Sequence, residues 1–143
     1  MMALFNRTLG AAVTVAALCA GGALMAQTGN IELELNTAAD VNGGCRLTYV
    51  ATNSSPVSLE KMTYEVAVYD LDGIVKLLLE LGFGGLPSGK TRVVQFDVPE
   101  LGCGAISRIL VNTSVECTAA EGEQTICRDN QILSSRVRTI QFN

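Results

Sequence analysis

The clearest pattern of apolar and polar positions lies in residues 62–73, MTYEVAVYDLDG. Every second residue from 62 to 68 is apolar, and a mixed set of side chains alternates with them, which predicts a β-strand with one buried face. Asp72 and Gly73 then favour a tight turn, because Gly accepts a positive φ and Asp tolerates it. Residues 74–83 can return as the partner strand. The pattern therefore predicts a β-hairpin.

Strand patterns recur along the chain, and no segment has a convincing helix pattern. The 74–83 segment, IVKLLLELGF, is the most ambiguous, because its leucines also favour a helix. The turn before it and the glycines after it favour a strand. The predicted strands are residues 31–35, 45–53, 62–69, 74–83, 90–98, 105–117 and 136–142.

Short strands separated by turns are typical of an all-β fold, and we expect a single immunoglobulin-like β-sandwich of about seven strands with two disulfides. In the sixth segment, alternation predicts one face made of Ile109, Val111, Thr113, Val115 and Cys117. The last segment is expected to carry Arg136 and Arg138 on one face. As an edge strand it would either pair with a partner chain or, as we prefer, use these charges to prevent such pairing.

The first 26 residues have the features of a secretory signal peptide. Arg7 is followed by a run of apolar and small residues over 9–23. Cleavage is expected after Ala26, and a cut after Ala23 is the alternative. The apolar run is too short for a comfortable membrane span. We therefore interpret residues 1–26 as a leader that is removed on export.

The remaining chain, residues 27–143, is predicted to be one β-sandwich domain, located in the periplasm of a Gram-negative bacterium or secreted. The full chain has 10 basic and 14 acidic residues, and loss of Arg7 makes the domain more acidic still. An acidic chain is repelled by phosphates, so nucleic acid is not an expected partner. No second apolar run of membrane length follows the leader, so stable membrane insertion is not expected.

Four of the five cysteines remain after cleavage, and an even number in an exported chain predicts two disulfides. If each connection reverses the chain, the loops after the first, third and fifth strands lie at one end of the sandwich. Cys45 and Cys103 then fall at the same end. Cys117 and Cys127 flank the hairpin after the sixth strand. The predicted pairs are therefore Cys45–Cys103 and Cys117–Cys127.

The sequence offers little for catalysis, and no catalytic residue, metal site or cofactor is predicted. There is no histidine to act as a base. Without a histidine, only a Ser–Lys or Thr–Lys pair could supply the base, and Lys61, Lys76 and Lys90 are interpreted as solvated surface lysines because they lie near turns or on polar faces. The cysteines lack the Cys-x-x-Cys spacing of redox enzymes, so structural disulfides are preferred.

Two further motifs have a structural and a functional explanation. Residues 70–73, DLDG, resemble the start of a calcium loop, but the twelfth position holds Leu81 instead of Glu. A hairpin turn is the preferred explanation. Asn53 and Asn112 lie in glycosylation sequons, and we prefer turn and strand-surface roles for them because the leader indicates a bacterial protein.

The run Val66-Ala67-Val68-Tyr69-Asp70, followed by Asp72-Gly73, resembles the core motif of FxLYD-like domains, which are small immunoglobulin-like sandwiches of bacterial exported proteins. Val66 and Val68 stand where the family has Phe and Leu. A polar strand end at 51–55 that contains Asn53, a turn at 86–89 and the ending Phe96-Asp97-Val98 are also similar, so the resemblance covers residues 47–98. It implies an accessory or adhesion-like module at the cell envelope, without catalytic residues.

Two functions remain as hypotheses. The first is a non-catalytic binding or accessory module, which holds an envelope protein through its loops or an edge strand. The second is a small periplasmic enzyme, such as a hydrolase, with a cryptic site. A deep pocket containing a carboxylate or lysine of strongly shifted pKa would favour the enzyme. An apolar patch or a free edge strand would favour binding. Whether the Cys117–Cys127 hairpin is a recognition site stays open.

Overall fold

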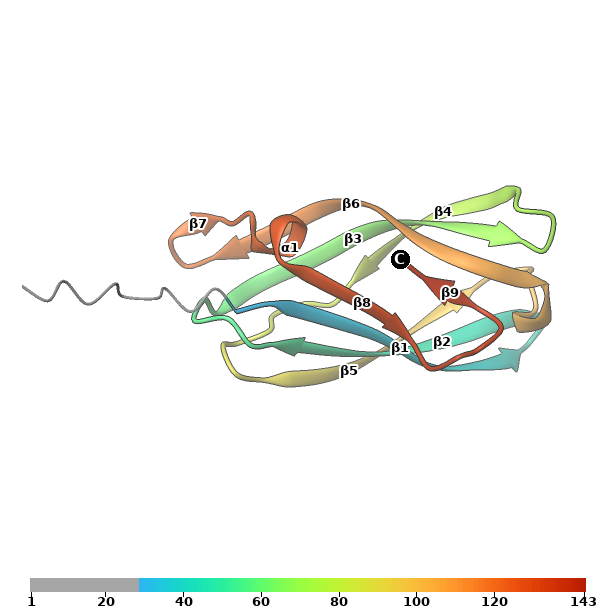
Figure 1. Ribbon diagram of the computed structural model, residues 1–143, viewed down its shortest axis with the longest axis horizontal. Coiled ribbons are helices and arrows are strands. Elements are labelled where there is room, and N and C mark those ends of the chain that lie inside the picture. Colours follow the sequence, from blue (N-terminus) through green and yellow to red (C-terminus); the bar gives the residue numbers. More distant parts are fainter. Residues whose placement is uncertain (1–28) are drawn as a thin grey trace, which may run out of the picture.

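Residues 29–143, which a computed structural model describes, form a sandwich of two β-sheets (Figure 1). The expected leader and its cleavage site lie outside the described residues. From edge to edge, the first sheet contains β5 (Thr91–Val98), β2 (Gly44–Asn53), β1 (Ile31–Val41) and β8 (Gln131–Ser135). The second sheet contains β4 (Val75–Gly82), β3 (Leu59–Asp70), β6 (Ile106–Ala119) and β7 (Gly122–Glu123), and β9 (Gln141–Phe142) also pairs with β6.

The core lies between the sheets, where the strands present their apolar faces. The predicted apolar face of β3 is buried there and consists of Met62, Tyr64, Val66 and Val68. From the other sheet, Tyr49 meets Phe142 edge to face, with 5.1 Å between the ring centroids. Burial raises the pKa of the Tyr49 and Tyr64 phenols above their usual range. The Tyr64 hydroxyl donates a hydrogen bond to the carbonyl of Cys127 at 2.9 Å, which ties the core to the last part of the chain.

The hairpin formed by β3 and β4 confirms the prediction made for residues 62–83. Gly73 has a φ of 77°, as the turn requires. The carboxylate of Asp70 accepts hydrogen bonds from the backbone N–H of Asp72 at 3.0 Å and of Ile74 at 2.9 Å. These bonds account for the DLDG motif as a turn. The leucine-rich segment that follows is a strand, not a helix.

The all-β sandwich with two disulfides is confirmed, although the described residues contain nine strands rather than seven. β1 extends well beyond the predicted end at residue 35, because a bulge at Asn36 restores its pairing with β2. Two short helices also appear, η1 (Cys103–Ala105) and α1 (Ile126–Asp129). Neither helix of residues 29–143 is long and apolar enough to cross a membrane.

The predicted common face of residues 109–117 on β6 is wrong. Ile109 and Cys117 are buried, but Thr113 and Val115 are exposed. The register of β6 against β3 skips Asn112 and Val115, so each of these residues is a bulge. One extra residue moves the side chains that follow to the other face of the sheet. Two bulges therefore interrupt the alternation that the prediction assumed.

The predicted last strand over residues 136–142 is also wrong, because the chain forms two short strands with a turn between them. β8 pairs with β1 and β9 pairs with β6, so the turn carries the chain from one sheet to the other. Ser135 holds this turn: its hydroxyl accepts from the N–H of Val137 at 3.2 Å and donates to the carbonyl of Ile140 at 2.7 Å. These hydrogen bonds replace strand pairing at the point of crossing.

Candidate functional site

The two disulfides lie at opposite ends of the sandwich and confirm both predicted pairs. Cys45 and Cys103 join β2 to η1, with 4.8 Å between their Cα atoms. Cys117 and Cys127 join β6 to α1, with 6.1 Å between their Cα atoms. The second pair is at the end with β7 and α1, and the turn between β3 and β4 is at the other end (Figure 1). Two disulfides are compatible with an extracellular or periplasmic location.

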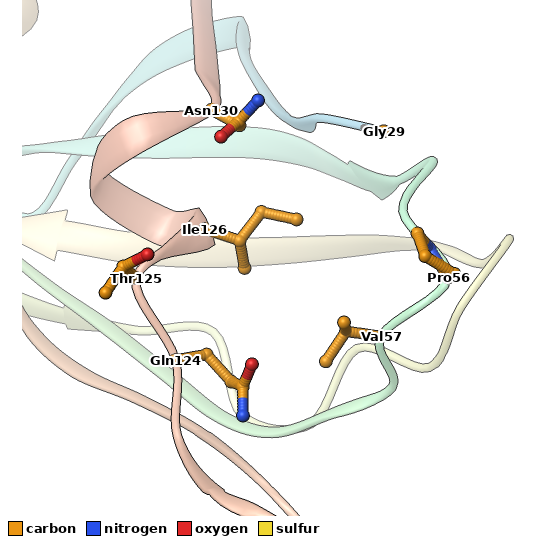
Figure 2. Close-up of a pocket in the computed structure, with 7 residues that line it drawn as sticks. All are labelled: Gly29, Pro56, Val57, Gln124, Thr125, Ile126 and Asn130. Carbon is orange, nitrogen blue, oxygen red and sulfur yellow. The ribbon is translucent and has the colours of Figure 1, made fainter. Parts of the chain in front are cut away.

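A shallow pocket of about 230 Å³ lies beside α1, whose first residue, Ile126, lines it (Figure 2). Val57 and Ile126 extend into it from opposite sides. Among residues 29–143, no Asp, Glu, Lys or Arg lines it, and its described wall consists of Gly29, Pro56, Val57, Gln124, Thr125, Ile126 and Asn130. An adjoining hollow of about 400 Å³ adds Glu121. The pocket can accept an apolar group, but it offers no paired acid and base for catalysis.

The loop on one side of this pocket is held by a buried polar network. Asn53 is fully buried, and its Nδ2 donates to the carbonyls of Val57 at 2.7 Å and Leu86 at 2.9 Å. Its Oδ1 accepts from the N–H of Ser55 at 3.0 Å and also from the Ser55 hydroxyl. Both ends of the Asn53 amide are therefore used by the loop, which supports the turn role predicted for it.

Arg136 and Arg138 do not form the charged face of an edge strand, so that prediction is wrong. They lie in the turn between β8 and β9. Arg136 pairs with Glu34 of β1 at 2.8 Å. Arg138 lines a hollow of about 430 Å³ together with Arg108. The Arg108 guanidinium stacks 4.0 Å from the ring centroid of Tyr69, which is a cation–π contact.

The largest concentration of exposed apolar side chains is on the arm of the β3–β4 hairpin. We call it the β4 surface, and it consists of Leu71 (70% exposed), Ile74 (59%), Val75 (46%) and Leu78 (56%). The other exposed large apolar residues of the described chain lie singly on other strands: Val93, Val115 and Ile132. Exposed large apolar residues that lie singly are normal on a protein surface, whereas four on one hairpin arm are a cluster.

β4 is also an edge strand whose outer side is unpaired in the described residues. The N–H of Phe83 donates to the carbonyl of Met62 at 2.8 Å, so these two residues form a hydrogen-bonded pair of the ladder. Because such pairs alternate in an antiparallel ladder, the N–H and C=O groups of Leu78, Glu80 and Gly82 point away from β3. They form a row of free donors and acceptors to which another strand can add.

On the outward face of β4, an apolar side chain is left in solvent and a carboxylate has no oppositely charged neighbour within the sheet. Leu78 lies opposite Ala67 of β3, and Leu110 of β6 lies on the other side of Ala67, so an apolar row crosses three strands. Glu80 lies opposite Glu65, which places two carboxylates side by side. Like charges in facing positions of a sheet are destabilising. Among the described residues, no ion pair forms to Glu80.

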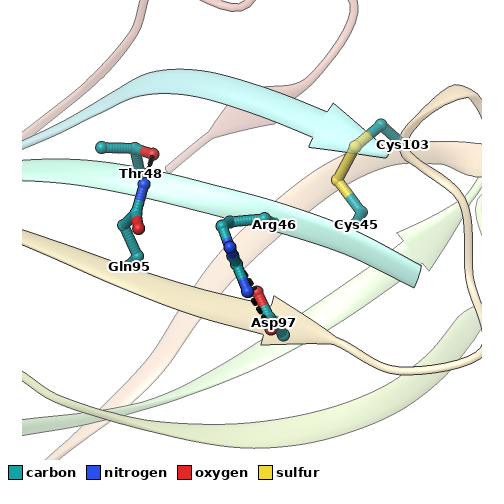
Figure 3. Close-up of polar contacts among 6 residues, drawn as sticks. All are labelled: Cys45, Arg46, Thr48, Gln95, Asp97 and Cys103. Atoms are coloured by element: carbon teal, nitrogen blue, oxygen red, sulfur yellow. Dashed lines mark hydrogen bonds and ion pairs between the residues drawn. A yellow bond between two sulfur atoms is a disulfide. The ribbon is translucent and has the colours of Figure 1, made fainter. Parts of the chain in front are cut away.

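The opposite edge strand, β5, is satisfied within its own sheet (Figure 3). Arg46 of β2 makes two hydrogen bonds to the Asp97 carboxylate, at 2.7 and 2.8 Å. The side chain of Gln95 donates to the hydroxyl of Thr48 at 3.0 Å. The hydrogen bonds from Arg46 lower the pKa of Asp97, which keeps that carboxylate charged. The polar side chains Gln95 and Asp97 on the outward face of β5 therefore form hydrogen bonds with the neighbouring strand β2.

The other carboxylates with a shifted pKa are also explained by exposed hydrogen-bonded pairs. Hydrogen bonds from Asn36 and Arg136 lower the pKa of Glu34. Hydrogen bonds from Arg128 and Thr125 lower the pKa of Asp129. Neither carboxylate lines the pockets described above. Within residues 29–143, no group of three or more His, Cys, Asp or Glu is placed to hold a metal ion.

No protein-family model, curated protein or solved structure matches this chain. The resemblance to FxLYD-like domains therefore stays a prediction. The sequence suggests an edge strand in residues 136–142, whereas the structure places an unpaired edge at β4. The signal was present, because residues 74–81 are apolar at both odd and even positions. A strand that buries only one face needs apolar residues at alternate positions only, so the apolar residues on its other face have no partner within the chain's core.

Proposed function

We propose that this protein is a non-catalytic binding module that takes up a β-strand of a protein partner along the free edge of β4. The observation that carries the proposal is the coincidence of two features on one strand. Leu78 is a large exposed apolar residue, and its backbone N–H and C=O point outward. Strand addition uses both, because the backbone supplies hydrogen bonds and the side chains supply specificity.

The proposal includes export. The leader at residues 1–26, cut after Ala26, would deliver the domain to the periplasm of a Gram-negative bacterium. The two disulfides support an oxidising compartment. The partner would then be a protein of the cell envelope. A small hydrolase gains no support from the geometry, because none of the described residues that line the pocket in Figure 2 is charged.

The proposal is tested by photo-crosslinking in cells with a crosslinking amino acid at position 78, and at position 93 as the matched control. Val93 is 63% exposed on the other edge strand, β5. The N–H of Asn53 donates to the carbonyl of Lys90 at 2.9 Å, so by alternation the N–H and C=O of Val93 also point away from their sheet. We expect an adduct from position 78 and none from position 93. Absence of any adduct from position 78, or equal adducts from both, contradicts the proposal.

A further inference from the structure

We propose that the strand added to β4 is β4 of a second copy of this chain, paired antiparallel with Leu78 opposite Leu78. This inference rests on the function proposed above, because it names the partner of the same edge. The two-fold axis would pass between the two Leu78 residues. The two second sheets would then join into one sheet that runs through both copies.

The backbone geometry of β4 allows this arrangement. The outward N–H and C=O of Leu78 can exchange two hydrogen bonds with Leu78 of the second copy. The single irregularity in the pairing of β4 is a bulge at Lys76, near the start of the strand. Residues 77–82 are regular, and a regular edge without Pro is a good template for pairing.

The charges of β4 select this register. With Leu78 at the axis, Lys76 of each copy would lie opposite Glu80 of the other, so two ion pairs could form by symmetry. Each would compete with the ion pair that Lys76 makes with Asp70 of its own chain, where Nζ and Oδ2 are 3.8 Å apart. Glu80, which faces only Glu65 in its own sheet, would gain a cation. Centring the pair on Glu80 or on Lys76 would instead oppose like charges, which is destabilising. Centring it on Leu77 or Leu79 would place neither charge opposite its complement.

The apolar residues fit the same register. Leu78 of the two copies would meet on the outward face, next to the apolar row that Ala67 and Leu110 continue. On the inward face, Leu77 of one copy would lie opposite Leu79 of the other. Both are partly buried and packed against the core, so the added strand would complete their burial. The second copy therefore covers side chains that one copy leaves in water.

The experiment is analytical ultracentrifugation of the mature, disulfide-bonded protein and three charge variants, at concentrations on the order of 100 μM and below. We expect a dimer for the wild type. Lys76→Glu and Glu80→Lys should each weaken it about tenfold or more, because each places two like-charge pairs in the interface. The double variant Lys76→Glu/Glu80→Lys restores both opposite pairs and should recover dimerisation to near the wild-type level.

Thermal unfolding of the same variants separates interface effects from misfolding. Glu80→Lys replaces one of the two facing carboxylates, Glu65 and Glu80, with a cation, so its monomer should be at least as stable as the wild type while its dimer is weaker. Val93→Glu on β5 is the matched control and should leave the dimer unchanged. The proposed register is supported if each single charge variant weakens the dimer, the double variant restores it and Val93→Glu leaves it unchanged.

A monomeric wild type, or a double variant that stays as weak as the single ones, overturns the inference. Equal weakening by Val93→Glu also overturns it. These failures differ from failure of the proposed function. If position 78 crosslinks to another envelope protein and the purified chain is a monomer, strand addition stands and self-pairing does not. If position 78 gives no adduct at all, both fail.

Discussion

The two outer strands β4 and β5 hold equivalent places in the sandwich and differ in how their outward faces are satisfied. β5 is linked to β2 by polar pairs such as Arg46–Asp97 and Thr48–Gln95 (Figure 3). β4 presents Leu78 to solvent and places Glu80 opposite another carboxylate. Both edges have free backbone groups, so backbone geometry does not separate them. The side chains do, and this difference is the reason for proposing that a partner strand covers β4 and not β5.

The largest expected effect comes from the disulfide beside the polar edge. Cys45→Ser/Cys103→Ser opens a link between residues 58 apart in sequence, which should lower the free energy of unfolding by about 4 kcal/mol. Urea denaturation monitored by circular dichroism measures it. Because this disulfide is not part of β4, the fraction that stays folded should still crosslink from position 78. Loss of that adduct in the folded fraction would mean that the two edges are coupled.

The next effect contrasts the edges directly. Leu78→Lys should weaken association by about 2 kcal/mol, or roughly thirtyfold in Kd, because it places a charge at the centre of the interface. Val93→Lys introduces the same change on β5 and should have no effect on association. Sedimentation or crosslinking yield measures both. Similar losses for the two variants would remove the distinction between β4 and β5.

A smaller effect concerns pH. In the folded protein, hydrogen bonds from Arg46 hold the pKa of Asp97 below its usual value of 3.8. The pair therefore stabilises the fold above that value, and this contribution is lost as the pH falls through the lowered pKa. Asp97→Asn should be less stable than the wild type near neutral pH, and the difference should shrink below about pH 4. Urea denaturation across this range measures it, and a difference independent of pH would contradict the role of the pair.

The smallest effect is at Glu80. Glu80→Gln removes one of two facing carboxylates, so it should raise the free energy of unfolding of the isolated chain by about 0.3 kcal/mol. Thermal denaturation at low salt measures this, since screening weakens such repulsion. Glu116→Gln on β6 is a control, because Glu116 lies 3.8 Å from Lys61 and accepts a hydrogen bond from Thr63. That variant should not be stabilised.

Local patterns were enough to predict the hairpin turn at Asp72 and Gly73, the fold class and both disulfide pairs. These features depend on turn residues and on the direction of successive strands, which alternation reveals. The bulges at Asn112 and Val115 were not predictable, because they arise from the fit of β6 against β3. The parallel pairing of β8 with β1 joins residues far apart in sequence, so no local signal marks it.

The same reason explains why the candidate site was missed. Whether a strand lies at the edge of a sheet depends on the order in which all strands of that sheet pair. β3 pairs with β6 on one side and β4 on the other, and nothing among the described residues pairs beyond β4. The sequence did contain the apolar character of residues 74–81. Without the strand order, that pattern predicts burial and not an exposed edge.

Hydrogen–deuterium exchange, resolved to single amides, tests the central claim most directly. Leu78 and Val93 both direct their backbone N–H away from their own sheet, so both should exchange rapidly in the isolated chain. We predict that the Leu78 amide becomes protected when the β4 edge is covered by its partner strand, while the Val93 amide still exchanges rapidly. Rapid exchange at Leu78 in the assembled protein, or equal protection of both amides, would contradict the account.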